Sequence, residues 1–252
     1  IVYINNKYIK NGSLDINSLF TTESVYENVK KLQKKIPDKI IELKAVLNKK
    51  SIPQIDIGPH CTTPYNCDFR GHCWKHIPEY SIFDIASLKL KKKFELNNKN
   101  ILQLSEIPAD FSFSKTQRIQ VDSELNDVII CDNEKIHNFL SELNYPLHYL
   151  DFETFNSAIP IFDKTKPYQQ LVFQYSLHIQ NHIKSDIEHY EFLTETDGSD
   201  PRIKFTEQLI RNCKKEGDIL VYNISFERGK IKDLIKCFPE YSNSLNKIIT
   251  RL

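Results

Sequence analysis

Residues 145–154 read Tyr-Pro-Leu-His-Tyr-Leu-Asp-Phe-Glu-Thr, an apolar segment that ends in two carboxylates at alternate positions, Asp151 and Glu153. In a β-strand, residues i and i+2 point to the same face and lie about 6.5–7 Å apart. Two carboxylates at this spacing can share divalent cations held about 4 Å apart, the arrangement that two-metal phosphoryl chemistry uses. A D-x-E triplet alone is a weak signal in a chain with 33 acidic residues, so the flanking elements decide its meaning.

The pattern of apolar residues is regular from residue 133 onward. It predicts a helix over 133–143, a buried strand over 147–153, and two further strands over 171–179 and 187–193. Asp200-Pro201 is typical of a helix start, and we expect that helix to end at Gly217. A short strand over 218–222 and another helix follow. The order β-β-β-α-β-α predicts an α/β fold with a mixed sheet and helices packed on it.

A second acidic segment, Asn223-Ile-Ser-Phe-Glu227, follows the strand predicted over 218–222 and opens a helix. Ligands of such sheets bind beyond the carboxyl ends of the strands, where Asp151 and Glu153 also lie. Three carboxylates gathered there would repel one another without cations. Magnesium or manganese, which prefer oxygen ligands, would relieve that repulsion. The same segment also has a purely structural interpretation. Asn223 is a common turn residue, and the helix dipole alone favours Glu227 in the first turn of a helix.

These two segments resemble the first two motifs of the DEDD (DnaQ-like) 3′–5′ exonucleases: Asp151-Phe152-Glu153-Thr154, and Asn223-x-x-Phe226-Glu227. The order of elements is similar to the ribonuclease H-like fold of that family, and the resemblance covers about residues 145–252. It is closest to an uncharacterised bacterial family with an L-D-F-E-T strand. Glu227 departs from the pattern, since the second motif usually ends in Asp. The third motif, with a Tyr or His and a last Asp, is expected beyond Leu252.

The resemblance implies a 3′–5′ exonuclease that acts on DNA or RNA with two Mg²⁺ or Mn²⁺ ions. Asp151 would bridge both metals, Glu153 would bind the metal on the nucleophile side, and Glu227 would hold the second metal through water. Thr154 and Phe155 would approach the terminal nucleotide, and Asn223 and Phe226 would shape the site. Without the third motif, the chain itself is expected to be weak or inactive. The alternative is a degenerate nuclease fold that binds nucleic acid or a protein partner.

Composition narrows the class of protein. The 252 residues are 40% hydrophobic, and the formal net charge of +1 leaves nucleic-acid binding to local patches. Lys164, Lys166 and Tyr168 are candidates for such contacts, or simply a surface loop. The chain starts at Ile1 and contains no Met, so we expect a piece of a longer protein. It has no run of 18 apolar residues, and we expect a cytoplasmic protein that does not enter a membrane.

The N-terminal part has a different pattern, with short strands and helices. Ile1–Ile4, an Asn5-Asn6 turn and Tyr8–Ile9 predict a hairpin. Helices are expected over about 22–35 and, after Pro37, around residues 40–47. We expect a smaller α+β region over 1–76, a connector over 77–132 and the sheet domain over 133–252. In the connector, the basic run Lys89–Lys93 is typical of a solvated face.

Three of the six cysteines, Cys61, Cys67 and Cys73, fall within thirteen residues, in a segment rich in Pro and Gly. Such spacing favours a metal or cluster site in a reducing compartment over a disulfide framework. The segment resembles the end of RecB-like nucleases of the PD-(D/E)XK class, in which three C-terminal cysteines join an upstream one around a 4Fe–4S cluster. Zinc is the alternative, with a fourth ligand from the nearby histidines, and unligated cysteines are the third possibility. The candidate histidines are His60, His72 and His76.

Overall fold

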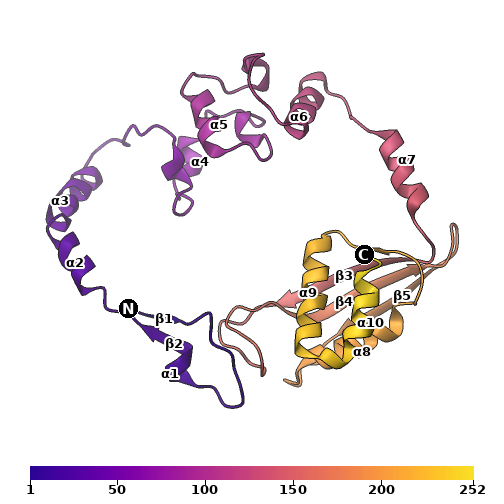
Figure 1. Cartoon of the computed structure of the whole chain (residues 1–252). Helices are drawn as coiled ribbons and strands as arrows, with labels where there is room; N and C mark the ends of the chain where they lie inside the picture. Colours follow the sequence, from indigo (N-terminus) through magenta and orange to yellow (C-terminus); the bar gives the residue numbers. More distant parts are fainter. The chain divides into compact units, whose positions relative to one another are not determined.

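The computed structural model describes all residues from Ile1 to Leu252 and divides into two compact units. The sheet unit combines residues 1–31 with residues 134–252, and the middle unit holds residues 32–133 (Figure 1). The sheet unit therefore draws its residues from both ends of the chain. The two units are described separately below.

A four-stranded mixed sheet forms the centre of the sheet unit, in the order β5-β4-β3-β6. The strands β3, β4 and β5 pair antiparallel, whereas β6 lies parallel to β3 at the sheet edge. The predicted mixed sheet and its hairpin-first order are confirmed. The bounds are β3 (Leu147–Phe155), β4 (Leu171–Gln180), β5 (Ile187–Leu193) and β6 (Ile219–Leu220).

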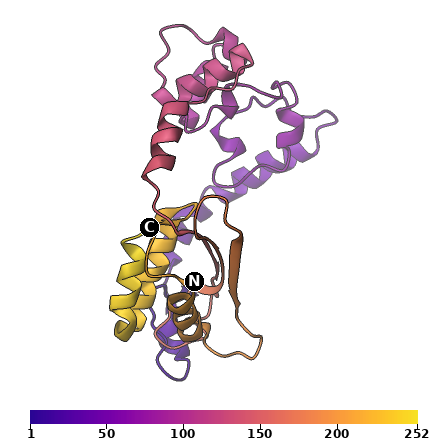
Figure 2. The same ribbon diagram turned by 90° about the vertical axis from the view of Figure 1, so that its right-hand side faces the viewer.

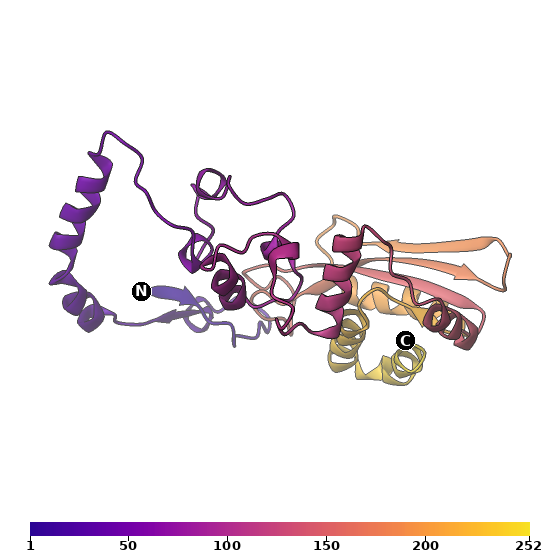
Figure 3. The same ribbon diagram turned by 90° about the horizontal axis from the view of Figure 1, so that it is seen from above.

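Three helices cover one face of this sheet: α8 (Pro201–Asn212), α9 (Ile224–Cys237) and α10 (Ser242–Ile249). Figure 3 shows the strands in one layer and α9 and α10 in the next, and Figure 2 shows the same two layers from the side. The main core lies between the layers. Its centre is Phe152 of β3, whose ring centroid is 5.2 Å from that of Phe205 on α8. Ile231 of α9 and Leu245 of α10 close it.

The start of α8 is as predicted, but its end is not. Asp200 caps the helix by accepting the backbone N–H of Arg202 at 3.1 Å, and Pro201 occupies the first turn. The helix ends at Asn212 instead of near Gly217. Residues 214–217 turn back toward β6, and the Arg251 guanidinium binds the carbonyl oxygens of Lys214, Glu216 and Gly217. Contacts from the end of the chain therefore replace the last helical turn.

Arg251 also lies against His148, whose side chain is fully buried in β3. The backbone N–H of His148 donates to the Asp218 carbonyl oxygen at 2.9 Å. Burial lowers the pKa of His148, and the nearby Arg251 charge lowers it further. His148 is therefore a neutral strand residue that joins β3 to the segment leading into β6. His178, the other strand histidine, lies exposed in β4.

The prediction of the N-terminal hairpin named the wrong second strand. β1 (Val2–Ile4) pairs antiparallel with β2 (Phe20–Thr22), and not with Tyr8–Ile9. Asp15 caps the short helix α1 (Ile16–Leu19) by accepting the N–H groups of Asn17 and Ser18, and this helix leads directly into β2. A long loop over residues 5–15 therefore takes the place of the expected tight turn. The helix α2 (Tyr26–Gln33) is shorter than predicted at both ends.

The middle unit combines helices with irregular segments and has two small cores. Ile82, Ile85 and Val121 belong to one, and Ile57, Cys61 and Phe94 form the other. None of the helices of the chain combines the length and apolar character that a membrane-spanning segment needs. The bounds are α3 (Ile36–Leu47), α4 (Arg70–Cys73), α5 (Leu90–Asn97) and α6 (Lys115–Asn126). Helix α7 (Asn133–Glu142) lies almost entirely in the sheet unit and over nearly the predicted range.

Gly217 gives a test of the turn that leads into β6. Its φ is +79°, and a Cβ atom there would lie 1.9 Å from the Pro146 carbonyl oxygen. Gly198 has a similar φ of +78° but open space around it. We expect Gly198→Ala to lower the free energy of unfolding by about 1–2 kcal/mol, because alanine disfavours the left-handed conformation. Gly217→Ala should lower it clearly more, because the backbone at Pro146 must also move. Urea unfolding of both variants measures this, and equal losses would contradict the role of the contact.

Candidate acidic site at the ends of β3 and β6

The alternation of side chains along β3 sets the position of the first two carboxylates. Leu150 and Phe152 point into the core under the helices and are each 3% exposed. Asp151 and Glu153 alternate with them, so they lie on the opposite face of the sheet, and both are exposed. The structure thus brings the two carboxylates of the first segment to one face.

A β-bulge follows Glu153. The register passes from Glu153↔Gln174 to Thr154↔Val172, which leaves Phe173 of β4 without a partner on β3. Bulges bend a strand and re-aim the side chains around them, and they are frequent beside functional sites. Beyond the bulge, Phe155 is half-buried, with its ring centroid 6.1 Å from that of Phe173 and 6.4 Å from that of Phe162. Thr154 is half-buried as well.

The third carboxylate lies in the first turn of α9. Asn223 precedes that helix without a side-chain capping bond, and its carbonyl oxygen accepts the Glu227 N–H at 3.4 Å. The Glu227 side chain is almost fully buried, at 2% exposed, and its Oε2 atom has no hydrogen-bond partner. Buried polar atoms are nearly always paired, so an unpaired carboxylate oxygen calls for an explanation.

The electrostatics of Glu227 link it to the first segment. Burial raises the pKa of Glu227 above its ordinary value, and the negative charge of Asp151 raises it as well. A hydrogen bond from its own backbone N–H acts in the opposite direction. Because β6 runs parallel to β3, the carboxyl ends of both strands meet at the same end of the sheet. The structure therefore brings Asp151 and Glu227 within electrostatic range.

Asp151 and Glu227 together can bind a proton or a cation. The side chains as they stand do not form a group of three Asp, Glu, His or Cys residues close enough to hold one metal ion. The two other predicted residues of the second segment frame the pair. Asn223 is exposed, and Phe226 packs against the main core with the Lys230 ammonium 5.8 Å from its ring centroid.

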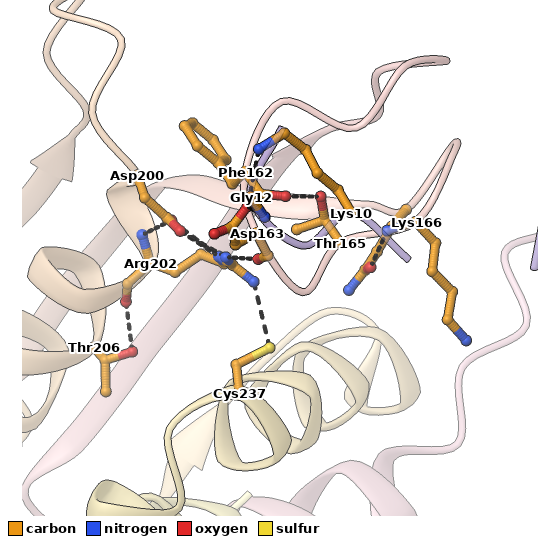
Figure 4. Close-up of polar contacts among 11 residues, drawn as sticks. Lys10, Gly12, Phe162, Asp163, Thr165, Lys166, Asp200, Arg202, Thr206 and Cys237 are labelled. Carbon is orange, nitrogen blue, oxygen red and sulfur yellow. Dashed lines mark hydrogen bonds and ion pairs between the residues drawn. The ribbon is translucent and has the colours of Figure 1, made fainter. Parts of the chain in front are cut away.

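The loop after β3 carries the predicted contacts Lys164, Lys166 and Tyr168, and all three side chains are exposed. Figure 4 shows that the N-terminal loop anchors this segment. The Asp163 carboxylate accepts the Lys10 ammonium at 2.9 Å and the Gly12 N–H at 3.0 Å. These bonds lower the pKa of Asp163, those from Lys10 most. Sequence reasoning missed this contact, which joins residues 153 positions apart.

Arg202 extends the same network into the helix layer (Figure 4). It is 4% exposed and pairs with Asp200 at 2.6 Å, and it also donates to the Asp163 carbonyl oxygen at 2.8 Å. A third contact joins it to the Cys237 sulfur at 3.3 Å. A buried arginine needs such partners, and Arg202 therefore ties the loop after β3 to α8 and to the end of α9. No motif in the sequence marks it.

The cysteine segment is compact but does not gather its thiols around a common point. Cys61 is buried, Cys67 is exposed and Cys73 is half-buried, and all six cysteines of the chain are free thiols. The Cys67 N–H donates to the Cys61 carbonyl oxygen at 2.9 Å, and the Gly58 N–H lies 3.5 Å from the Cys61 sulfur. These thiols and the nearby histidines form no three-residue group that could hold a metal ion.

Comparison with known proteins finds a matching family model and a relative. Residues 148–252 match the model of a domain of unknown function, DUF2779. A stretch of 111 residues is 29% identical to an uncharacterized protein MG366 homolog of Mycoplasma pneumoniae. That stretch is 41% of this chain but 17% of the relative, so the match spans a small part of that protein. No solved structure matches the chain. The matched domain begins inside β3 and includes Asp151, Glu153 and Glu227.

Proposed function

We propose that the sheet unit is a ribonuclease H-like nuclease domain that removes nucleotides from the 3′ end of DNA or RNA. The order of its elements supports this proposal, since three antiparallel strands precede a helix and a parallel edge strand. The placement of acidic residues supports it further, because Asp151 and Glu153 lie in the middle and C-terminal part of β3, and Glu227 lies in the helix that follows the adjacent parallel strand β6.

The observation that carries the proposal is the buried carboxylate of Glu227, whose Oε2 atom is unpaired, beside Asp151. A protein gains nothing structural from burying a carboxylate oxygen without a partner, and a second negative charge adds to the cost. Divalent cations with oxygen ligands would remove both penalties. The donor set therefore fits Mg²⁺ or Mn²⁺, held by Asp151, Glu153 and Glu227. Such ions would supply a more acidic water and stabilise charge on the phosphate.

The other predicted residues take supporting roles in this proposal. Thr154 and Phe155 follow the carboxylates directly, at the bulge, where they are half-buried and can contact the terminal nucleotide. Asn223 and Phe226 hold the turn between β6 and α9 that presents Glu227. Lys164 and Lys166 lie exposed in the loop anchored by Lys10 and are available for phosphates.

The activity is tested with end-labelled single-stranded DNA and RNA in the presence of Mn²⁺. We expect the full-length protein to shorten these substrates from the 3′ end, and its Asp151→Ala variant to lose roughly 10²–10³-fold of that activity, the range found when a group that stabilises transition-state charge is removed. Glu191→Ala is the matched control. Glu191 is an exposed carboxylate on β5, and its partner on β4 is Ser176, the residue that also pairs with Asp151 of β3. Equal activity of the Asp151→Ala variant and the wild type would refute the assignment.

A second candidate function is a nuclease fold that binds nucleic acid or a protein partner without cleaving it. It is favoured by one observation, namely that Glu227 is one methylene longer than the Asp that usually ends the second motif. In the assay above, binding of the oligonucleotide without any shortening in Mn²⁺ would support this candidate.

Glu227 predicts an effect on stability that does not depend on turnover. Its pKa is raised in the folded protein, so folding is favoured while the carboxyl is protonated, below its ordinary value of 4.5. That advantage is lost as the pH rises through the raised folded pKa. Glu227→Gln removes the charge, so we expect a higher Tm than wild type at about pH 8 and no such gain at about pH 4. Glu191→Gln is the control.

Addition of Mn²⁺ sharpens this comparison. The ion should raise the Tm of the wild type, because it binds the folded state, and should raise that of Glu227→Gln less. A Gln variant that melts below wild type at about pH 8 would mean that the Glu227 carboxylate has a structural partner.

For the cysteine segment we keep the proposal of a RecB-like nuclease region with a 4Fe–4S cluster, and zinc as its alternative. Soft thiolates select either one, and the dense spacing of Cys61, Cys67 and Cys73 supports such a site. Protein purified without oxygen should then be brown, with broad visible absorbance that Cys67→Ser abolishes. A colourless protein that carries zinc would favour a zinc site. A protein that carries neither iron nor zinc would mean that the three cysteines are unligated and that Cys61 serves only in the core.

A further inference from the structure

Tyr222 is the most exposed large side chain of the sheet unit. It follows β6 directly, precedes Asn223, and has a relative exposure of 104%, so solvent surrounds the whole ring. Tyrosines usually bury much of the ring and leave only the hydroxyl exposed. A fully exposed ring contributes nothing to the core, and its position beside the acidic site suggests another use.

The position of Tyr222 follows from its neighbours. Ile219 is a core residue and Val221 packs against the same core, so both point toward the helix layer. Leu220 is paired with Tyr149 of β3, and Asp151 lies two residues beyond Tyr149 in the same direction. The pairing ends at Leu220, and Tyr222 lies in the bend that follows β6 at this end of the sheet.

Tyr222 is also tied to the third carboxylate. Asn223 separates it from α9, and Glu227 lies in the first turn of that helix. Tyr222 therefore lies in the bend that joins β6 to the helix of Glu227, and β6 itself is paired with the strand of Asp151 and Glu153. Both neighbouring elements carry acidic side chains, so an anionic group would not be drawn to the ring itself. A flat, uncharged, aromatic group would be, because stacking needs no opposite charge.

We propose that Tyr222 stacks on the unpaired base of the nucleotide at the 3′ end. This inference rests on the proposed function and names its substrate more closely: a single-stranded end whose last base is free to leave its own stack. Stacking on an aromatic side chain tolerates any base, because each base has a π-face. Tyr222 is then a positioning residue for the terminal nucleotide, and the carboxylates act on the phosphate.

The test compares Tyr222→Ala with Tyr222→Phe on two oligonucleotides that differ only in the terminal base. One ends in a normal nucleotide, and the other ends in an abasic residue. With the normal end, Tyr222→Ala should raise KM roughly 5- to 100-fold, and Tyr222→Phe should stay near wild type, since the ring is what stacks. With the abasic end, all three proteins should behave alike. Equal losses on both substrates, or no loss on either, overturn the proposal.

Tyr65→Ala is the matched control for the removal of an exposed tyrosine. Tyr65 is 84% exposed and belongs to the middle unit. The variant should leave KM unchanged on both substrates. If it raises KM as much as Tyr222→Ala does, the effect does not come from stacking at the site and the proposal fails.

A second readout needs no turnover. In an Asp151→Asn background with Ca²⁺, an oligonucleotide with 2-aminopurine as its last base should lose fluorescence on binding, and the additional Tyr222→Ala change should restore it. Persistence of the quenching without Tyr222, or its absence with Tyr222, overturns the stacking proposal. Activity that survives Asp151→Ala refutes the proposed function instead, so the two failures are distinguishable.

Discussion

The burial of alternate residues of β3 is the constraint on which the rest of the sheet unit depends. Leu150 and Phe152 enter the core against α8, and once they do, Asp151 and Glu153 must point to the other face. A slip of one residue in the pairing with β4 would bury both carboxylates and expose both apolar side chains. Packing energy in the core therefore also fixes where the acidic groups are displayed.

The second constraint is electrostatic and acts against stability. Glu227 is buried with an unpaired oxygen and feels the charge of Asp151, which makes the ionised pair unfavourable in the folded protein. Other charged groups near the same loop are neutralised in place: Arg202 by Asp200, and Lys10 by Asp163. The contrast with these two paired charges supports a ligand role for Glu227.

Local signals in the sequence predicted much of the sheet unit. The alternation of apolar residues gave the bounds of β5, and Asp200-Pro201 gave the start of α8. Features that depend on distant contacts could not be found in this way. The partner of β1 was wrong because the Asn5-Asn6 pair indicates a tight turn, whereas Asp15 instead caps a helix that leads into β2. The role of Arg202 was missed because its partners Asp163 and Cys237 come from separate segments. Helix α10 was missed because only two of its residues, Leu245 and Ile248, are buried.

The discontinuous composition of the sheet unit has a consequence for biosynthesis. Residues 1–31 are translated before the loop that holds Lys10 and Gly12, which lies more than a hundred residues downstream. Until Asp163 has been translated, this leading segment has no docking partner, whereas residues 32–133 already possess cores of their own. The intervening unit can thus fold during translation, before residues 1–31 meet the loop that carries Asp163.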